Sequence, residues 1–422
     1  MELSKLTTSS ILILGFGREG QDAFVFLKKA FPDKTTAIAD IKSQEEFSQE
    51  AQELLSSTTT HLGNSYTDSI SKYDVIVKAP GIPLHTIQPY LSDNQKITSS
   101  TAIFFANCPS TIIGITGTKG KSTVASLIYQ VLQKGDRPVH LVGNIGIPSL
   151  QALSNATPQD IFVYELSSFQ LEGMTQSPHI AVFLNLYQEH LNHHQTFKAY
   201  KQAKANIALH QTAKDILIYN KEDAELKDIA AATKAELIPY AQTSAHSFIA
   251  PTEPASIIGK LFDIPEETIN QAVSEFKPLA HRLENIGEYK GITFYNDSLA
   301  TIPEATIAAL KSLGGNTHTL IAGGFDRGVD YSELAAYIEG SSIQTLIAFP
   351  DTGKKIVDLL DGKRMIQSMF VDTMQDAVQK AYEHTPQGSI CLLSPAASSF
   401  NLFLDYADRG DKFKEEVMRH GK

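Results

Sequence analysis

The sequence predicts an α/β protein with three successive units, each built on a parallel β-sheet. At 422 residues the chain is longer than one hydrophobic core usually organises, so we expect two or three domains. Short apolar runs alternate with helix-like stretches along the chain, which is the rhythm of βαβ units. Several of these runs are apolar throughout, without polar residues between the apolar ones, which is typical of buried parallel strands.

The first unit is predicted over residues 1–99. Its strand-like runs are "ILILGFG", "TTAIADI" and "YDVIVKAPGIP", and the stretch "QDAFVFLKKAF" between the first two is helix-like. The run from Ile11 to Leu14 is short, leads into a glycine turn and has no small-residue cleavage site after it. It therefore indicates a first strand and not a signal peptide.

The second unit is predicted over residues 100–312 and the third over 313–422. The second contains the strand-like runs "TIIGITG", "IFVYELS" and "IAVFLNL". In the third, "THTLIAGG", "IQTLIAFP" and "GSICLLSP" are separated by the helix-like stretches "DYSELAAYI" and "MQDAVQKAYEH". The same α/β rhythm therefore continues to the end of the chain.

Composition excludes several classes of partner. The sequence is 42% hydrophobic but has no run of the ~20 apolar residues that a membrane helix needs, so no membrane insertion is expected. The net charge is -11 and the basic residues are scattered, which argues against a nucleic-acid partner. With only Cys108 and Cys391 present, neither a disulfide framework nor a cysteine metal site is expected, as in a reducing cytoplasm.

The stretch "GFGREG", residues 15–20, matches the pattern G-x-G-x-x-G between a predicted strand and a predicted helix. Asp40 ends the next strand-like run, about 20 residues later, as in a dinucleotide-binding fold. Such a turn needs its glycines for backbone geometry with or without a ligand. An NAD-dependent oxidoreductase is therefore one hypothesis at this point, and a purely structural turn is another.

The stretch "GITGTKGKST", residues 114–123, resembles a phosphate-binding loop but departs from G-x-x-x-x-G-K-[ST], because Ile115 stands where the first glycine belongs. A strand, a tight glycine loop and a helix that starts at Lys-Ser-Thr still place backbone N–H groups at a helix N-terminus. There Lys121 can reach the β- and γ-phosphates, and Ser122 or Thr123 can hold Mg²⁺. ATP is the expected ligand, and a structural glycine turn is the alternative.

Two later stretches contain candidate metal ligands. In "YELSSFQLE", Glu165 ends a predicted strand and suits a second Mg²⁺ contact, although Ser167 or Ser168 could simply cap the next helix. In "NLYQEHLNHH", the spacing of three histidines suggests zinc, but the pattern H-E-x-x-H is absent. We therefore expect His193 and His194 to be surface residues, and His190 to be the better ligand candidate.

Further basic and acidic residues leave their roles open. Lys201 and Lys204 lie in the helix-like stretch "AYKQAKANI", where a solvated basic face is the usual interpretation. Arg282 in "AHRLE" could meet a phosphate or form an ion pair with Glu284. The spacing of residues takes the assignment no further.

Taken together and in this order, these strings resemble the Mur ligase family, the ATP-dependent amide-forming enzymes of peptidoglycan precursor synthesis. The family's loop is T-G-T-x-G-K-[ST]-T, which is present from Thr116 to Thr123, so the departure at residue 115 is the family's own form. "GNIG", "HRLE", "NDS" and "GGFDRGVDY" also match. The strings "ELSSFQLE", "APGI" and "LLSPAASSFNLFLDYADRG" are most similar to the branch that adds D-glutamate to UDP-N-acetylmuramoyl-L-alanine.

The resemblance implies a Rossmann-like N-terminal domain that binds the UDP of the substrate and a central P-loop ATPase-like domain that binds ATP and Mg²⁺. It also implies a Rossmann-like C-terminal domain that closes over both and contacts D-glutamate, in a cytoplasmic and monomeric enzyme. The residues that it assigns to ATP are Gly117, Thr118, Lys119, Gly120, Lys121, Ser122, Thr123, Arg282, Asn296, Asp297, Asp326 and Arg327. Those that it assigns to the UDP substrate are Gly17, Arg18, Glu19, Asp40, Ile41, Gly81 and Asn144.

The resemblance further assigns D-glutamate to Lys355, Ser399, Phe400 and Tyr406. It makes Lys121, His190 and Lys204 catalytic, and its metal ligands are Ser122, Glu165, His190 and Lys204. Lys204 ends the pattern Y-x-x-A-K, whose lysine is carbamylated in the family; carbamylation turns a cation into an anionic oxygen ligand. The chain departs from the family's pattern at Gln188, Asn192, Leu299 and Ile302.

Three alternatives stay open at this stage. A related ligase would add a different amino acid to the same kind of UDP precursor. An NAD-dependent oxidoreductase would bind NAD at residues 15–20 and need no ATP. A P-loop ATPase or kinase that acts as a switch would release phosphate without an amine acceptor.

Overall fold

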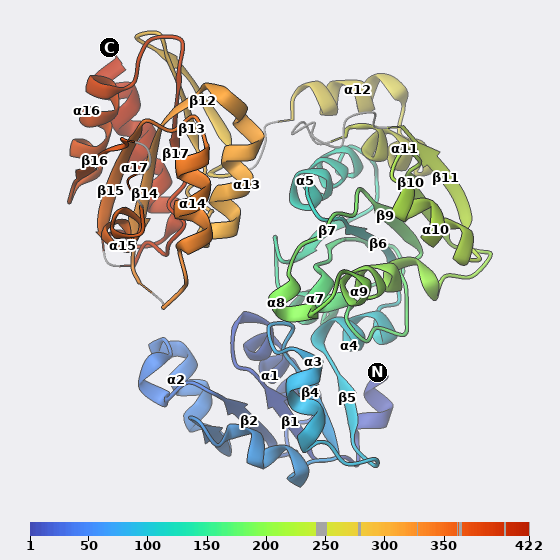
Figure 1. Cartoon of the computed structure of the whole chain (residues 1–422). Coiled ribbons are helices and arrows are strands. Elements are labelled where there is room, and N and C mark those ends of the chain that lie inside the picture. The colour runs from blue at the N-terminus through green and yellow to red at the C-terminus, as the bar shows by residue number, and fades with distance from the viewer. Residues whose placement is uncertain are drawn as a thin grey trace. The chain divides into compact units, whose positions relative to one another are not determined.

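Figure 1 shows the computed structural model of the chain, which describes residues 1–241, 251–276, 280–326, 328–360, 362, 365–400 and 402–421. These residues fall into two compact units, one up to residue 276 and one from residue 280 onward. The first unit contains two β-sheets and the second contains one. Within the described residues, no helix is long and apolar enough to cross a membrane.

The N-terminal sheet has the strand order β3-β2-β1-β4-β5, and all its neighbouring strands are parallel. Its strands are β1 (Ile11–Leu14), β2 (Thr36–Asp40), β3 (Thr60–Leu62), β4 (Val75–Lys78) and β5 (Lys96–Thr98). Its helices are η1 (Leu3–Leu6), α1 (Arg18–Ala30), η2 (Gln44–Glu46), α2 (Gln49–Ser56), η3 (Tyr66–Lys72), α3 (Leu84–Ile87) and η4 (Gln88–Tyr90). All four residues of β1 are buried, as expected for a central strand covered on both faces.

The central sheet has the order β11-β10-β9-β6-β8-β7 and is also parallel throughout. Its strands are β6 (Thr111–Thr116), β7 (Val139–Gly143), β8 (Ile161–Glu165), β9 (Ile180–Phe183), β10 (Ile216–Asn220) and β11 (Glu236–Tyr240). Its helices are α4 (Ser100–Asn107), α5 (Lys121–Leu132), α6 (Ser149–Leu153), α7 (Ser168–Leu171), α8 (Leu191–His194), α9 (Phe197–Leu209), α10 (Ala224–Ala232), α11 (Glu253–Leu261) and α12 (Glu266–Ser274). Because β6 lies between β8 and β9, the segments that follow these three strands meet at one edge of the sheet.

The first two sheets share a hydrophobic core, which explains why they form one compact unit. Phe104, on α4, packs its ring 5.1 Å from that of Phe162 and 5.3 Å from that of Tyr164 on β8. The same cluster of buried side chains continues into β1 and α1 of the N-terminal sheet. A boundary at residue 99/100 is therefore a change of sheet within one packed body.

The C-terminal sheet has the order β12-β13-β17-β14-β15-β16, with only the β12–β13 pair antiparallel. Its strands are β12 (Glu284–Tyr289), β13 (Ile292–Asn296), β14 (Thr317–Gly324), β15 (Thr345–Asp351), β16 (Gln367–Phe370) and β17 (Ile390–Leu393). Its helices are α13 (Pro303–Leu313), η5 (Gly314–Asn316), α14 (Ser332–Gly340), α15 (Thr352–Asp358), α16 (Met374–His384) and α17 (Tyr406–Gly421). Neighbouring residues of β14 face opposite sides of the sheet: Ile321 packs in the cluster of α16 and α17, and Leu320 in that of α13 and α14. Figure 1 labels these four helices around the C-terminal sheet.

The strand-like runs quoted from the sequence all form strands, and the four helix-like stretches form α1, α9, α14 and α16. The boundary predicted at residue 312 is wrong. β13 pairs in parallel with β17, near the end of the chain, so residues 284–312 belong to the C-terminal sheet and its helices. The place of β13 in this sheet depends on its pairing with β17, which is distant in sequence, and local periodicity does not reveal such a pairing.

Candidate active site at the edge of the central sheet

The glycine loop between β6 and α5 has the backbone of a phosphate-binding loop. Gly120 stands just before α5 with φ of +82°, a left-handed conformation that favours glycine. A Cβ on Gly117 would lie 2.9 Å from that of Leu184, so the close approach also requires glycine there. Ile115 is fully buried within β6, opposite Glu165 of β8 and Val182 of β9. Its position as a strand residue explains the departure from the usual loop pattern.

The segment after β9 holds this loop in place. The N–H of Thr118 donates to the carbonyl oxygen of Asn185 at 3.0 Å, and the N–H of Lys119 donates to Asn185 Oδ1 at 2.9 Å. Sequence reasoning missed Asn185, although a polar residue directly after a buried strand, at the carboxyl end of a parallel sheet, is a usable signal.

The first side chains of α5 face β8. Lys121 Nζ donates to the carbonyl oxygens of Gly117 and Thr118, at 3.0 Å each. Ser122 Oγ donates to Glu165 Oε2 at 3.1 Å, and both side chains are buried. Ser167 caps α7, with its Oγ accepting from the N–H of Gln170. A serine thus caps the helix, as one of the two interpretations expects, and Glu165 lies beside the phosphate loop.

Lys204 reaches this loop from the interior of the protein. Only 1% of it is exposed, and its Nζ donates to Gly117 O at 2.8 Å and to Thr116 Oγ1 at 3.2 Å. Burial, reinforced by the charge of Lys121, lowers the pKa of Lys204 well below its ordinary value. The solvated face expected of this helix belongs instead to Lys201, which pairs with Glu225 and Asp228.

His190 lies next to these cations. It precedes α8 with φ of +56°, and its Nε2 is 3.6 Å from Glu189 Oε2. Burial lowers the pKa of His190; Glu189 opposes this shift, while Lys121 and Lys204 add to it. A neutral imidazole, which is the form that can bind a metal, is thus favoured.

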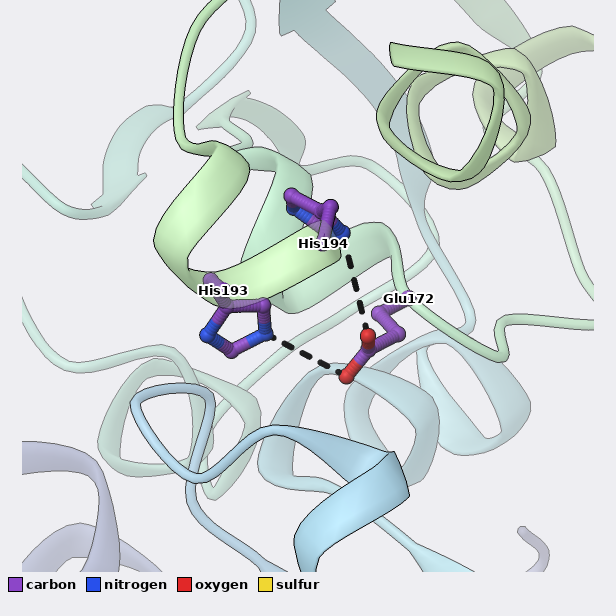
Figure 2. Close-up of side chains that lie close together, drawn as sticks. All are labelled: Glu172, His193 and His194. Atoms are coloured by element: carbon purple, nitrogen blue, oxygen red, sulfur yellow. Dashed lines mark ion pairs between the residues drawn. The ribbon is translucent and has the colours of Figure 1, made fainter. Parts of the chain in front are cut away.

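The prediction that His193 and His194 are surface residues is wrong. Both are buried, and both rings pack against Phe169. As Figure 2 shows, they flank Glu172, with His193 Nε2 at 3.5 Å and His194 Nδ1 at 3.8 Å from its carboxylate oxygens. A short helix after a polar loop would be exposed in isolation, but here α9 and the ring of Phe169 on α7 pack against it.

Lys78 of β4 completes this group, which we call the Glu172 junction. Its Nζ is 3.5 Å from Glu172 Oε2 and donates to Ile82 O at 2.7 Å. Burial alone raises the pKa of Glu172, but His193 and Lys78 outweigh burial and hold the pKa at about 2. The positive charge of Lys78 thus already balances this carboxylate, and the junction ties the N-terminal sheet to α7 and α8.

The second glycine loop, residues 15–20, leads from β1 into α1. Gly15 has φ of +91°, and a Cβ on Gly20 would lie 2.1 Å from Gly15 O, so both positions require glycine. Asp40, at the end of β2, accepts the N–H of Phe16 at 2.6 Å and that of Lys42 at 3.0 Å. The turn is therefore held by a buried carboxylate of the protein itself.

This loop contacts the segment that carries the "GNIG" string. Arg18 donates to Gly146 O at 2.5 Å and to Asn144 O at 3.4 Å. Gln170 Nε2 donates to Glu19 Oε1 at 2.8 Å. Of the residues predicted to bind UDP, Arg18, Glu19 and Asn144 thus come together; Gly17, Ile41 and Gly81 are exposed, and Ile41 has 61% of its surface accessible.

The remaining predicted residues lie in the C-terminal unit. Asn296 and Asp297 are buried, where Asn296 Nδ2 donates to Glu284 Oε2 and Asp297 accepts from Ser394 Oγ and the N–H of Leu283. Asp326 forms an ion pair with Lys355. The others are Ser399, which is buried, Phe400 and Tyr406, which are exposed, and Arg282, which is partly buried. Arg327 lies outside the described residues.

Known proteins match the chain from end to end. The model of the Mur ligase middle domain matches residues 115–272, and that of the Mur ligase glutamate ligase domain matches residues 281–397. The UDP-N-acetylmuramoylalanine--D-glutamate ligase of Enterococcus hirae is 32% identical, covering 98% of this chain and 96% of that protein. The ligase of the same name from Listeria innocua is also 32% identical, covering 96% of each.

The fold has a solved counterpart as well. The structure of MurF ligase from Thermotoga maritima in complex with ADP aligns over 99% of this chain and 97% of its own, with a TM-score of 0.51 and 16% identity. At that identity the likeness concerns the fold alone. The family is shown by the matching domain models and by relatives of about one-third identity over nearly the whole length: the chain belongs to the Mur ligase family.

Proposed function

We propose that this chain is an ATP-dependent ligase that joins D-glutamate to UDP-N-acetylmuramoyl-L-alanine in peptidoglycan precursor synthesis. The observation that carries the proposal is the 32% identity, over 98% of the chain, to a relative named for this reaction. The loop from Gly117 to Gly120, with Lys121, Ser122 and Glu165 beside it, supports the ATP-dependent half of the proposal.

The reaction needs an activated carboxyl group because a carboxylate is a poor electrophile toward an amine. The L-alanyl carboxylate attacks the γ-phosphorus of ATP, the bond from that phosphorus to the ADP oxygen breaks, and an acyl phosphate forms. The amine of D-glutamate then attacks the acyl carbon, phosphate leaves, and the nitrogen loses a proton. The products are the amide, ADP and phosphate.

The phosphate loop is suited to the first step. The N–H groups at the start of α5 are suited to phosphate oxygens, and the ammonium group of Lys121 lies at the same loop. In this structure Lys121 donates to two carbonyl oxygens of its own loop. When ATP binds, phosphate oxygens would replace these acceptors, so that the charge of Lys121 lies where negative charge develops during the reaction. Removing one such contact typically costs ~3 kcal/mol of transition-state stabilisation.

The donor set beside the loop fits Mg²⁺. The hydroxyl of Ser122 and the carboxylate of Glu165 are oxygen ligands 3.1 Å apart, and His190 is the third proposed ligand. A bound Mg²⁺ would offset the charge of the phosphate oxygens. The buried pair of Ser122 and Glu165 keeps both ligand atoms in place before any ion arrives.

Lys204 is proposed as a metal ligand in its carbamylated form. Only a neutral amine adds to CO₂; the N–C bond forms and a proton leaves the nitrogen. The lowered pKa of Lys204 favours that neutral amine. Its Nζ lies 2.8 Å from Gly117 O, so the carbamate oxygens would arise beside the phosphate loop.

The substrate sites are part of the same proposal. The loop of residues 15–20, with Asp40, Ile41, Gly81 and Asn144, takes the UDP substrate. Arg282, Asn296, Asp297, Asp326 and Arg327 complete the ATP site, and D-glutamate contacts Lys355, Ser399, Phe400 and Tyr406. We also propose that the enzyme is a cytoplasmic monomer, which sedimentation at assay concentration tests.

The test is phosphate release with ATP, Mg²⁺ and UDP-N-acetylmuramoyl-L-alanine, comparing D-glutamate with L-alanine and with a diamino acid as the amine. We expect release only with D-glutamate. Release with another amine would identify a related ligase, and release without any amine would identify an ATPase. Tight NAD binding without ATP dependence would overturn the proposal altogether.

A further inference from the structure

A continuous chain of hydrogen bonds connects the two glycine loops. Gln170 Nε2 donates to Glu19 Oε1 at 2.8 Å, and Gln170 Oε1 accepts from Asn144 Nδ2 at 3.3 Å. Asn144 Nδ2 also donates to Glu165 Oε1 at 3.4 Å, and Glu165 Oε2 accepts from Ser122 Oγ at 3.1 Å. We call these five side chains the Gln170 relay.

The amide of Gln170 has a fixed orientation. Its Oε1 accepts the backbone N–H of Ser167 at 2.9 Å, as part of the capping box of α7, so that end of the amide must be the oxygen. Nε2 therefore faces Glu19 and acts as the donor. Only 2% of Gln170 is exposed, so water is a poor substitute for any of these partners.

Asn144 connects Gln170 to Glu165, because its amide nitrogen donates to both side chains. An amide nitrogen carries two protons, and Asn144 Nδ2 has two acceptors, one on Gln170 and one on Glu165. A substrate that draws Asn144 or Glu19 toward itself must therefore change the hydrogen bond that Glu165 accepts from Asn144. Glu165 in turn accepts from Ser122, at the start of the helix that carries Lys121.

Two further residues, Asp22 and Arg18, hold the first loop in place relative to this relay. Asp22 of α1 accepts the N–H groups of Leu150 and Gln151, both at 2.9 Å, at the start of α6. Arg18 reaches Gly146 O from the same helix. Because these contacts hold α1 against the central sheet, a displacement of the loop of residues 15–20 is transmitted through Glu19 to Gln170.

We propose that Gln170 is a positioning residue that couples binding of the UDP substrate at the loop of residues 15–20 to binding of ATP at the loop of residues 117–120. The inference rests on the proposed function, because it takes those two ligands as given. Coupling of this kind appears as a change in the affinity for one ligand when the other is bound, typically 5- to 150-fold.

The test measures the Kd of a non-hydrolysable ATP analogue by calorimetry, with and without saturating UDP-N-acetylmuramoyl-L-alanine. In the unaltered chain we expect the substrate to tighten binding at least ~5-fold. Gln170→Glu keeps the capping box but turns the donor that faces Glu19 into a carboxylate oxygen, so the ratio of the two Kd values should fall to about 1. Adding Glu19→Gln reverses donor and acceptor and should restore the ratio.

Ser167→Ala separates this role from a merely structural one. It removes the cap of α7 and the hydroxyl that donates to Gln170 Oε1 at 3.0 Å, but it keeps the backbone N–H of Ser167 that fixes the orientation of the amide, so we expect a lower Tm and an unchanged Kd ratio. A ratio that is equally strong in Gln170→Glu, or that the double variant leaves at 1, overturns the inference while the proposed function stands. Failure of the unaltered chain to bind either ligand overturns both.

Discussion

The two glycine loops share an arrangement of strand, glycine turn and helix, but the charged side chains around them differ. Each follows an interior strand of a parallel sheet, leads into a long helix and needs a glycine with positive φ, Gly15 in one and Gly120 in the other. Around the first loop lie the carboxylates of Asp40 and Glu19. The glycine pattern alone therefore does not distinguish the two sites.

Lysines surround the second loop. Lys121 and Lys204 donate to carbonyl oxygens of this loop, the side chain of Lys119 pairs with Glu189, and Glu165 accepts from Ser122 on α5. The ammonium group of Lys121 attracts a triphosphate to this loop, whereas the first loop presents the carboxylates of Asp40 and Glu19 as hydrogen-bond acceptors. We infer that the glycines set the backbone shape of a site at a helix N-terminus, whereas the charged side chains of neighbouring segments determine which ligand binds there.

The largest effect on the rate is expected from a substitution of Lys204 beside the second loop. We expect Lys204→Met to lower the rate of D-glutamate-dependent phosphate release by ~1,000-fold, because a ligand beside the transferred phosphate is lost. The thermal midpoint should not fall, since the substitution removes a polar group that is costly to bury and keeps the volume of the side chain. The matched control is Lys201→Met on the same helix, whose surface ion pairs predict little change in rate.

Rescue tests the carbamate itself. In Lys204→Ala, added acetate or formate should restore part of the activity by placing a small carboxylate where the carbamate stood. Full activity without rescue would remove Lys204 from the site.

The next largest effect is expected at Lys121. Lys121→Ala should lower turnover at least ~100-fold, since its ammonium group offsets the charge that develops on the γ-phosphate. Steady-state rates at saturating ATP measure this loss. Lys134→Ala, an exposed lysine just beyond the same helix, is the control and should retain its activity. Near-normal turnover of Lys121→Ala would contradict the assignment of this loop to ATP.

Beside the loop of residues 15–20, Asp40→Asn should lower the free energy of unfolding and weaken binding of the UDP substrate. One of the two N–H groups that the carboxylate accepts loses its partner, which costs ~1–3 kcal/mol of unfolding free energy. Urea denaturation measures this cost, and the KM for the UDP substrate should rise while that for ATP stays the same. Asp33→Asn, on an exposed turn, should change neither. A selective rise in the KM for ATP would reverse our assignment of the two loops.

The smallest effect concerns the pH dependence at Glu19. Burial raises the pKa of Glu19 from 4.5 to about 7; Gln170, Arg18 and Lys78 oppose the shift and Asp22 adds to it. Because the folded pKa lies above the unfolded one, the stabilising contribution is complete below about 4.5 and is lost as the pH rises through about 7. The urea midpoint of the unaltered chain should therefore fall relative to that of Glu19→Gln between about pH 5 and about pH 8. A constant difference would contradict the buried, raised pKa.

Much of the candidate site could be predicted from the sequence because it consists of local signals. A strand, a glycine turn and a helix start are encoded within about ten residues, so Lys121 and Ser122 could be placed before the structure was known. Asp40 and Glu165 each end a strand, and the carboxyl ends of parallel strands meet. The roles of Gln170 and Asn185 escaped prediction, because their partners lie in other parts of the chain.

The sequence by itself determined the buried parallel strands, their order along the chain, the two glycine loops and the resemblance to the Mur ligases. Only the tertiary structure decided that Lys204 and the two histidines after Asn192 are buried, and that β13 joins the C-terminal sheet. It alone brought Glu19 to within hydrogen-bonding distance of Gln170. The physical reason is that periodicity and turn chemistry act over a few residues, whereas burial, pKa and strand pairing depend on groups that are distant in the chain.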